Sequence, residues 1–145
     1  MNIPLSADQT SFMFNGKKLQ RITINPQNAD ENLFITQNIT IGDAINIKEF
    51  IVRGVDTVKN NVDLSKCVRL EKIDIRDTSI PSVTLPNSAA LTEVNYPAQI
   101  SEISIVDKPK LTTVSFDGTD NLESVTCKNT SDTVAKKVIS ILENL

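Results

Sequence analysis

An internal repeat between Leu70 and Cys127 constrains the fold of this chain more than any other feature. Six successive units match the pattern apolar-x-x-apolar-x-apolar, and their first residues lie 10, 11, 9, 11 and 11 positions apart. The last two apolar residues of each unit are two positions apart, which places both side chains on one face of a short strand. The six units are Leu70/Ile73/Ile75, Ile80/Val83/Leu85, Leu91/Val94/Tyr96, Ile100/Ile103/Ile105, Leu111/Val114/Phe116 and Leu122/Val125/Cys127.

Turn-forming residues follow each unit, as at Pro86-Asn87 and Asp117-Gly118. Two-residue Asn-Gly turns, which would indicate an antiparallel meander, are absent between the units. Taken in pairs, the units form coils of nearly constant length. We therefore expect a mainly β fold, a short β-solenoid whose coils stack into two parallel sheets around an aliphatic interior. The predicted solenoid core comprises Leu70, Ile73, Ile75, Val83, Leu85, Leu91, Val94, Ile103, Ile105, Leu111, Val114, Phe116 and Val125.

The first half-units, 70–75 (LEKIDI), 91–96 (LTEVNY) and 111–116 (LTTVSF), resemble leucine-rich repeats. The segments 85–88 (LPNS) and 109–112 (PKLT) are similar in style to the irregular repeats of BspA-like bacterial surface proteins and of virion or tail proteins of Bacteroidetes phages. The resemblance covers about 40% of the chain. The buried Asn that ends the strand of typical leucine-rich repeats is missing, and Thr78 and Thr119 stand near its place. The resemblance implies protein binding or scaffolding rather than chemistry.

The last segment, 130–145, changes its apolar spacing to that of a helix. Val134, Val138, Ile141, Leu142 and Leu145 recur at helical intervals. Ser131 or Asp132 is placed to cap the helix at its start, and Lys136 and Lys137 fall on the solvent side. We expect a terminal α-helix that caps the solenoid, with partner binding as the less favoured role.

The N-terminal segment, 1–45, does not share the repeat. Residues 11–24 contain two apolar stretches around Asn15-Gly16, a pattern that predicts a β-hairpin with a type I′ turn. Residues 1–10 are expected to be an extended arm or a frayed terminus. We therefore divide the chain into an N-terminal arm and β-hairpin element (1–45), a leucine-rich-repeat-like solenoid (46–129) and a capping helix (130–145). The candidate partner contacts are Ile3, Leu5, Phe12, Phe14, Lys17 and Lys18.

The charge balance argues against nucleic acid and membranes as partners. The net charge is −3, and no basic cluster exceeds two adjacent residues. No apolar stretch approaches the length of a membrane span. Residues 1–6 lack the features of a signal peptide, so we expect a virion or cytoplasmic location rather than secretion, unless a signal has been removed or export uses a dedicated route.

The residue inventory gives little support for catalysis. The chain has no histidine and two cysteines, Cys67 and Cys127, which we expect to be reduced and packed. We expect no catalytic, cofactor-binding or metal-binding residue. The acidic turn 117–121 offers oxygen ligands for calcium, although an ordinary turn is favoured. Glu71 and Glu93 would approach each other in stacked coils, the arrangement that glycoside hydrolysis needs, but a solvated face is favoured.

These observations favour a non-enzymatic structural or protein-interaction module. By resemblance it would be a component of a multi-chain assembly such as a phage virion or tail, with copies of itself or other virion proteins as partners and with no cofactor. The first alternative is a bacterial surface or adhesion module with leucine-rich repeats that binds host protein or glycan. The second alternative is a small carboxylate-dependent hydrolase built on a β-solenoid.

Overall fold

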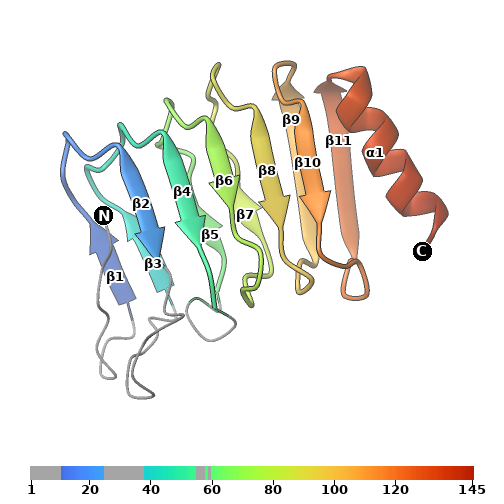
Figure 1. Ribbon diagram of the computed structural model, residues 1–145, viewed down its shortest axis with the longest axis horizontal. Helices are drawn as coiled ribbons and strands as arrows, with labels where there is room; N and C mark the ends of the chain where they lie inside the picture. Colours follow the sequence, from blue (N-terminus) through green and yellow to red (C-terminus); the bar gives the residue numbers. More distant parts are fainter. Residues whose placement is uncertain (1–10, 25–37, 55–57, 59) are drawn as a thin grey trace.

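The computed structural model describes residues 11–24, 38–54, 58 and 60–145. Within these residues the chain winds as a parallel β-solenoid of about four turns that ends in a helix (Figure 1). Each turn contributes one strand to a front layer and one to a back layer, and the chain runs in opposite directions in the two layers (Figure 1). The predicted fold class, a mainly β solenoid with two parallel-stranded layers and a C-terminal helix, is confirmed.

The front layer is a five-stranded parallel sheet in the order β10-β8-β6-β4-β2. Its strands are β2 (Arg21–Ile24), β4 (Glu49–Val52), β6 (Lys72–Asp74), β8 (Glu93–Tyr96) and β10 (Thr113–Phe116). The back layer contains three two-stranded parallel sheets, β1-β3, β5-β7 and β9-β11, and contacts of β3 with β5 and of β7 with β9 connect them. Its strands are β1 (Ser11–Phe14), β3 (Asn38–Ile41), β5 (Val62–Asp63), β7 (Val83–Thr84), β9 (Glu102–Lys108) and β11 (Ser124–Thr130).

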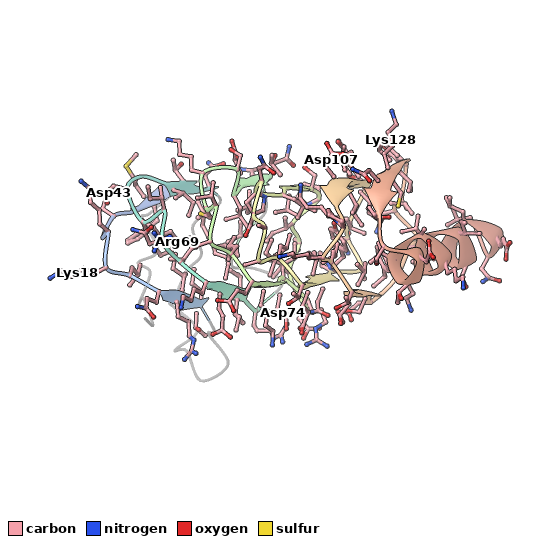
Figure 2. The ribbon with its side chains drawn as sticks, turned by 90° about the horizontal axis from the view of Figure 1, so that it is seen from above. Lys18, Asp43, Arg69, Asp74, Asp107 and Lys128 are labelled. Atoms are coloured by element: carbon pink, nitrogen blue, oxygen red, sulfur yellow. The ribbon has the colours of Figure 1, made fainter. Side chains whose placement is uncertain are left out.

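Apolar side chains at the same register position fill the space between the layers (Figure 2). One such row in the front layer consists of Ile22, Phe50, Ile73, Val94 and Val114, none of them more than 7% exposed. A single coil exposes half of each apolar side chain at its open edge, so burial is completed only when coils stack. Burial of apolar surface, at roughly 25 cal/mol per Å², is therefore gained between coils and drives the stacking.

The structure places the predicted core residues on the inner side of the strands and turns. Ten of them are buried: Leu70, Ile73, Ile75, Val83, Leu91, Val94, Ile103, Ile105, Leu111 and Val114. The other three, Leu85, Phe116 and Val125, are partly buried and pack against the buried cluster. Two of these three lie in the last strands of their layers, where no further coil follows within the solenoid.

The predicted N-terminal hairpin is wrong. β1 pairs in parallel with β3, and β2 pairs in parallel with β4, so the two strands belong to different layers. The connection between them spans residues 15–20 and contains a bend in which Leu19 N–H donates to Gly16 O at 3.0 Å. This bend carries the chain across to the other layer, whereas a two-residue turn would have returned it along β1. Strands β1, β2 and β3 thus extend the same two layers as the repeat.

Two serines at equivalent turns each join one coil to the coil before it. Ser88 Oγ donates to Leu70 O at 2.6 Å, and Ser131 Oγ donates to Leu111 O at 2.7 Å. Both hydroxyls also accept a nearby backbone N–H, from Ala90 at 3.2 Å and from Val134 at 3.3 Å. The side chains therefore satisfy carbonyls and amides that the turns leave outside the sheet ladders.

Helix α1 (Asp132–Glu143) closes the C-terminal end of the solenoid (Figure 1). Ser131 is its N-cap, and its hydroxyl accepts the Val134 N–H while donating to the preceding coil. Val134 and Val138 are buried, and the helix contacts β10 and β11. The same serine thus starts the helix and fixes it to the last coil.

We expect Val94→Asp to abolish cooperative folding, because an unpaired carboxylate would enter the fully buried front row at a cost of about 3–5 kcal/mol. Ser104→Asp introduces the same side chain at an exposed position of β9 and should change the free energy of unfolding by no more than about 0.5 kcal/mol. Urea unfolding followed by circular dichroism measures both. Equal effects of the two variants would contradict the register described above.

Candidate functional site

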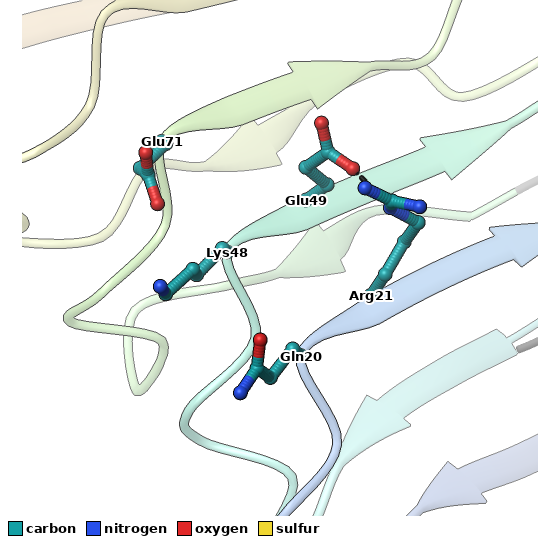
Figure 3. A pocket seen from close by; sticks show the side chains of 5 residues that line it. All are labelled: Gln20, Arg21, Lys48, Glu49 and Glu71. Atoms are coloured by element: carbon teal, nitrogen blue, oxygen red, sulfur yellow. Dashed lines mark hydrogen bonds and ion pairs between the residues drawn. The ribbon is translucent and has the colours of Figure 1, made fainter.

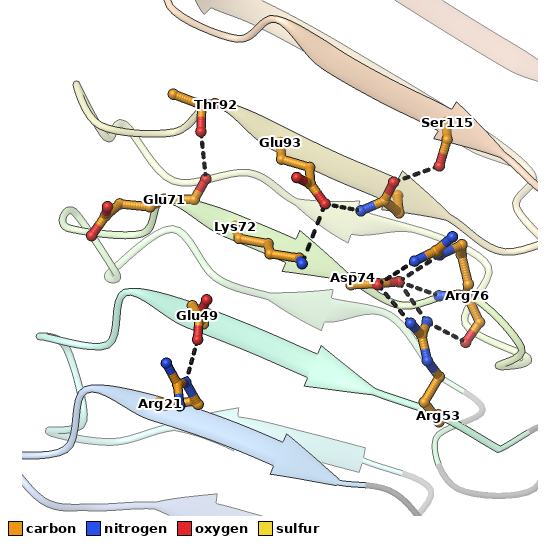
Figure 4. Close-up of polar contacts among 11 residues, drawn as sticks. Arg21, Glu49, Arg53, Glu71, Lys72, Asp74, Arg76, Thr92, Glu93 and Ser115 are labelled. Atoms are coloured by element: carbon orange, nitrogen blue, oxygen red, sulfur yellow. Dashed lines mark hydrogen bonds and ion pairs between the residues drawn. The ribbon is translucent and has the colours of Figure 1, made fainter.

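The outer surface of the front layer carries a charge ladder, which consists of Arg21, Glu49, Lys72 and Glu93. These residues are successive register partners on β2, β4, β6 and β8. Arg21 forms an ion pair with Glu49, and Lys72 Nζ lies 3.5 Å from Glu93 Oε2 (Figure 4). The signs of the charges alternate, so the ladder neutralises itself and offers little attraction to a charged ligand. Surface pairs of this kind also add little stability.

An arginine clamp, formed by Arg53, Asp74 and Arg76, lies beside the ladder at the carboxyl ends of β4 and β6 (Figure 4). Arg53 donates from Nη1 and Nη2 to the two carboxylate oxygens of Asp74 at 2.6 and 2.7 Å. Arg76 donates to the same two oxygens from Nε and Nη2 at 3.0 and 2.8 Å. These contacts cover the carboxylate, and Asp74 is only 2% exposed. The clamp therefore ties the coil of β4 to the coil of β6.

The pKa of the Asp74 carboxyl is held well below its usual range. Burial by itself raises this pKa, but the hydrogen bonds from Arg76 and Arg53 outweigh burial and favour the charged form. The same hydrogen bonds to Asp74 raise the pKa of Arg76. A carboxylate held in this way stays charged and paired, so it is suited to fixing the register of two coils and not to accepting a proton.

Asn95 extends this polar network towards β10. Its side-chain amide donates to Glu93 Oε2 at 2.8 Å, and its carbonyl accepts from Ser115 Oγ at 2.5 Å (Figure 4). Asn95 is buried, although it occupies the outward row of β8. The outer surface of the front layer is thus covered by side chains that bond one another.

An open groove crosses the ends of β2, β4 and β6 where the chain enters these strands (Figure 3). Its lining residues are all polar, and none is aromatic: Gln20, Arg21, Lys48, Glu49 and Glu71. One of the two carboxylates, that of Glu49, is paired with Arg21. The groove offers hydrogen bonds to a polar ligand but no aromatic surface on which a sugar ring stacks.

The structure places Glu71 and Glu93, the predicted carboxylate pair, in different surroundings. Glu93 is bonded to Lys72 and Asn95 within the polar network. Glu71 lines the groove, and its backbone carbonyl accepts the Thr92 hydroxyl at 3.3 Å (Figure 4). The side chain of Glu93 is therefore engaged in structural contacts and is poorly placed to act as a general acid or base.

The acidic turn between β10 and β11 is bonded to the neighbouring coil. Asn121 Nδ2 donates to Gln99 Oε1 at 3.2 Å and to Ala98 O at 3.4 Å. In the part of the chain that the structure describes, no group of three or more His, Cys, Asp or Glu residues is arranged to hold a metal ion. The contacts at this turn resemble those of a coil-to-coil connection.

The predicted partner contacts have different outcomes. Phe14 is 2% exposed and packs in the core, so its assignment as a contact is wrong. Phe12 is partly buried and lies edge-on to Phe14, with ring centroids 4.9 Å apart. The alternation of β1 explains this, because Phe12 and Phe14 share the inward face while Met13 points outward and is exposed. Lys17 and Lys18 are exposed on the turn after β1, and Ile3 and Leu5 lie outside the described residues.

A helix strip, which consists of Ala135, Ile139 and Leu142 on α1, was missed by sequence reasoning. These residues follow one another at intervals of four and three and therefore share one face of the helix. Ile139 is 54% and Leu142 is 44% exposed, while Val134 and Val138 face the solenoid. Leu142 and Leu145 recur with Val134 and Val138 at the predicted helical intervals, but both leucines are exposed. The sequence did contain a signal for this strip, because its apolar residues are too many to fit on one narrow stripe of the helix.

The chain matches no protein-family model, no curated protein and no solved structure. Of the helices in the described residues, none has both the length and the apolar character needed to cross a membrane. We take the helix strip as the candidate site, because the charged side chains of the front-layer strands are engaged in ion pairs with one another.

We expect Asp74→Asn to destabilise the protein by about 2–3 kcal/mol at neutral pH, because both arginines lose a charged acceptor. The folded-state pKa of Asp74 is lowered, so the carboxylate stabilises the fold above the unfolded-state pKa of about 3.9 and this contribution is lost as the pH falls. The difference in the free energy of unfolding between wild type and Asp74→Asn should therefore shrink below about pH 4. Urea unfolding at several pH values measures it.

Asp77→Asn is the matched control, since Asp77 is exposed in the turn that follows the clamp and Asn tolerates its positive φ of 58°. A stability gap for Asp74→Asn that stays constant from neutral pH to pH 3, or that equals the gap for Asp77→Asn, would contradict the role of the clamp.

Proposed function

We propose that this chain is a non-enzymatic protein-interaction module that supplies a rigid β-solenoid to a multi-chain assembly. The observation that carries the proposal is the helix strip, an apolar face of α1 that the solenoid does not cover. Ile139 is 54% and Leu142 is 44% exposed, and the helix that carries them lies at the end of the molecule (Figure 1). Adjacent exposed apolar side chains of this kind favour a protein partner.

The helix needs only one apolar stripe to cap the solenoid. Val134 and Val138 supply that stripe and are buried against the last coil. A surface helix that packs on one side is expected to be polar on its other sides. The helix strip departs from this expectation, and a contact with another chain accounts for the departure.

The partner that we propose for the helix strip is a second copy of this chain. Lys136 and Glu143 lie two helical turns apart along the strip, so both project from the same side of α1. In an antiparallel pair of α1 helices related by a two-fold axis near Ile139, Lys136 of one chain faces Glu143 of the partner subunit. Two such ion pairs would flank the apolar contact, and the small side chain of Ala135 allows a close approach.

The contact is expected to be weak when it acts alone. Helix α1 has 12 residues, and a pair of such helices buries less than the roughly 1,200 Å² at which stable, specific interfaces begin. Weak contacts become effective when several act together in an assembly. The resemblance of the repeat units to virion and tail proteins of phages supports a particle of that kind as the setting, and neighbouring genes for virion proteins would support it further.

The front layer supports the non-enzymatic part of the proposal. Its charged residues are engaged in the charge ladder and the arginine clamp, and Asp74 remains ionised over the physiological range. A residue that transfers protons near pH 7 needs a pKa close to that value. The pKa of the Asp74 carboxyl in the clamp is lowered, which moves it further from 7.

We expect wild-type protein to self-associate reversibly in the micromolar to millimolar range and the double variant Ile139→Ser/Leu142→Ser to remain monomeric. Sedimentation velocity over a range of concentrations measures this. Val68→Ser is the control, because Val68 is 53% exposed on a turn away from α1, so its replacement removes exposed apolar surface and leaves the helix strip intact.

Monomeric wild-type protein at the highest concentration would overturn the proposed self-association. Loss of association in Val68→Ser but not in the double variant would show that another surface carries it. Circular dichroism confirms that the double variant keeps α1.

A further inference from the structure

The dipeptide Asn15-Gly16 is the sole Asn-Gly pair in the sequence, and it lies in the turn that follows β1. Asn15 is exposed, and Gly16 has a φ of 135°, a conformation that favours glycine. A glycine after an asparagine leaves its backbone nitrogen unhindered for attack on the side-chain amide carbon. The fold also places the carboxylate and the backbone N–H of Asp43 beside this pair.

Asp43, which belongs to the next coil, contacts both reacting groups of Asn15-Gly16. The Gly16 N–H donates to Asp43 Oδ1 at 2.6 Å, and the Asp43 backbone N–H donates to Asn15 Oδ1 at 3.2 Å. The carboxylate is thus positioned at the proton that the nucleophile must lose. The backbone N–H is positioned at the oxygen on which negative charge develops.

Gly42 makes this arrangement possible. A Cβ atom at position 42 would overlap Asn15 Oδ1 and lie 3.1 Å from Asn15 Cγ, so any other residue at position 42 would force the Asn15 side chain to move. Gly42 N–H also donates to Phe14 O at 2.9 Å, which fixes the two turns side by side. The lack of a side chain at Gly42 therefore leaves room for the Asn15 amide beside the 42–43 backbone, where the Asp43 N–H binds it.

We propose that Asn15 is a site of self-modification at which Asp43 acts as general base and general acid. Gly16 N attacks Asn15 Cγ while its proton passes to the Asp43 carboxylate, and the Asp43 N–H stabilises the oxyanion at Asn15 Oδ1. The tetrahedral intermediate collapses with cleavage of the bond between Cγ and Nδ2. The proton held by Asp43 passes to the departing amide nitrogen, which leaves as ammonia, and a succinimide remains.

Water then opens the succinimide at either carbonyl and gives an aspartate or an isoaspartate residue at position 15. No oxidant, reductant or cofactor is needed, because the reactants are the chain and water. The product places a second carboxylate close to that of Asp43, and the two like charges repel each other, while an aspartate at position 15 keeps an oxygen that accepts the Asp43 backbone N–H. The modification should therefore loosen the contact between the first two turns, which are distant in sequence but adjacent in the fold.

The experiment incubates purified full-length protein at neutral pH and follows position 15 by peptide mapping with mass spectrometry and by release of ammonia. Wild-type folded protein is compared with the same protein unfolded in urea and with Asp43→Asn. The amide in Asp43→Asn keeps a hydrogen-bond acceptor but is no base. We expect the folded wild type to react at least about tenfold faster than either comparison.

Asp77→Asn, which removes an equal charge from a distant turn, should react like wild type. Gly42→Ala is a second variant, in which Asp43 is kept but Asn15 must move, and it should slow the reaction as well. Circular dichroism and the melting temperature establish that each variant is folded. Equal rates in folded wild type and folded Asp43→Asn, or a slower rate in folded than in unfolded wild type, would overturn the proposal.

Discussion

Every part of this structure depends on the parallel stacking of coils in register. The strands are short, and β5, β6 and β7 have only two or three residues each. No strand of this length is stable alone, because the entropy of ordering it exceeds what its few hydrogen bonds return. Stability comes from the rows that run across the coils, where each apolar side chain packs on its register partner. The fold therefore behaves as a one-dimensional stack of neighbours.

A stack of this kind requires that each coil find the correct register. A slip by one residue would turn the apolar row outward and bring the charge ladder into the core, so burial excludes it. A slip by two residues keeps the apolar row inside, so contacts other than this row must oppose it. The arginine clamp provides this opposition, because Arg53 on one coil bonds both oxygens of Asp74 on the next coil only in this register. We infer that the polar outer residues specify register more than they add stability.

The periodicity of the sequence predicted the part of the fold that depends on alternation. Rows such as Ile73, Val94 and Val114 follow from the alternation within each strand and from the nearly constant interval between coils. The N-terminal coils were harder to predict because they are longer: the register partners Arg21 and Glu49 lie further apart in the sequence than any partners within the repeat. The pattern around Asn15-Gly16 is locally that of a hairpin. The parallel partner that overrides it, β3, comes only after β2 in the chain.

The candidate site was still less accessible to sequence reasoning, since it depends on which helix face the solenoid covers. Val138, Ile139 and Leu142 are all apolar, and only the packing direction of α1 separates the buried valine from the exposed pair. The clamp was missed for a related reason. Asp74 looks like any outward polar residue of a strand until Arg53, from the preceding coil, is placed beside it. Periodicity predicts which face a residue occupies but does not predict which distant side chain will cover it.

The two ends of the solenoid differ in how they limit association. At the C-terminal end, α1 covers the last coil and offers no free strand edge, so only its side chains are available to another chain. A two-fold contact through the helix strip uses the same surface on both chains and therefore closes after two copies. At the other end, the outer edges of β1 and β2 pair with no other described strand. A helix-joined pair would thus carry its two first coils at opposite extremes. These edges could serve further contacts of an assembly beside the turn that holds Asn15 and Asp43, which makes the chemistry of that turn relevant to how such an assembly ages.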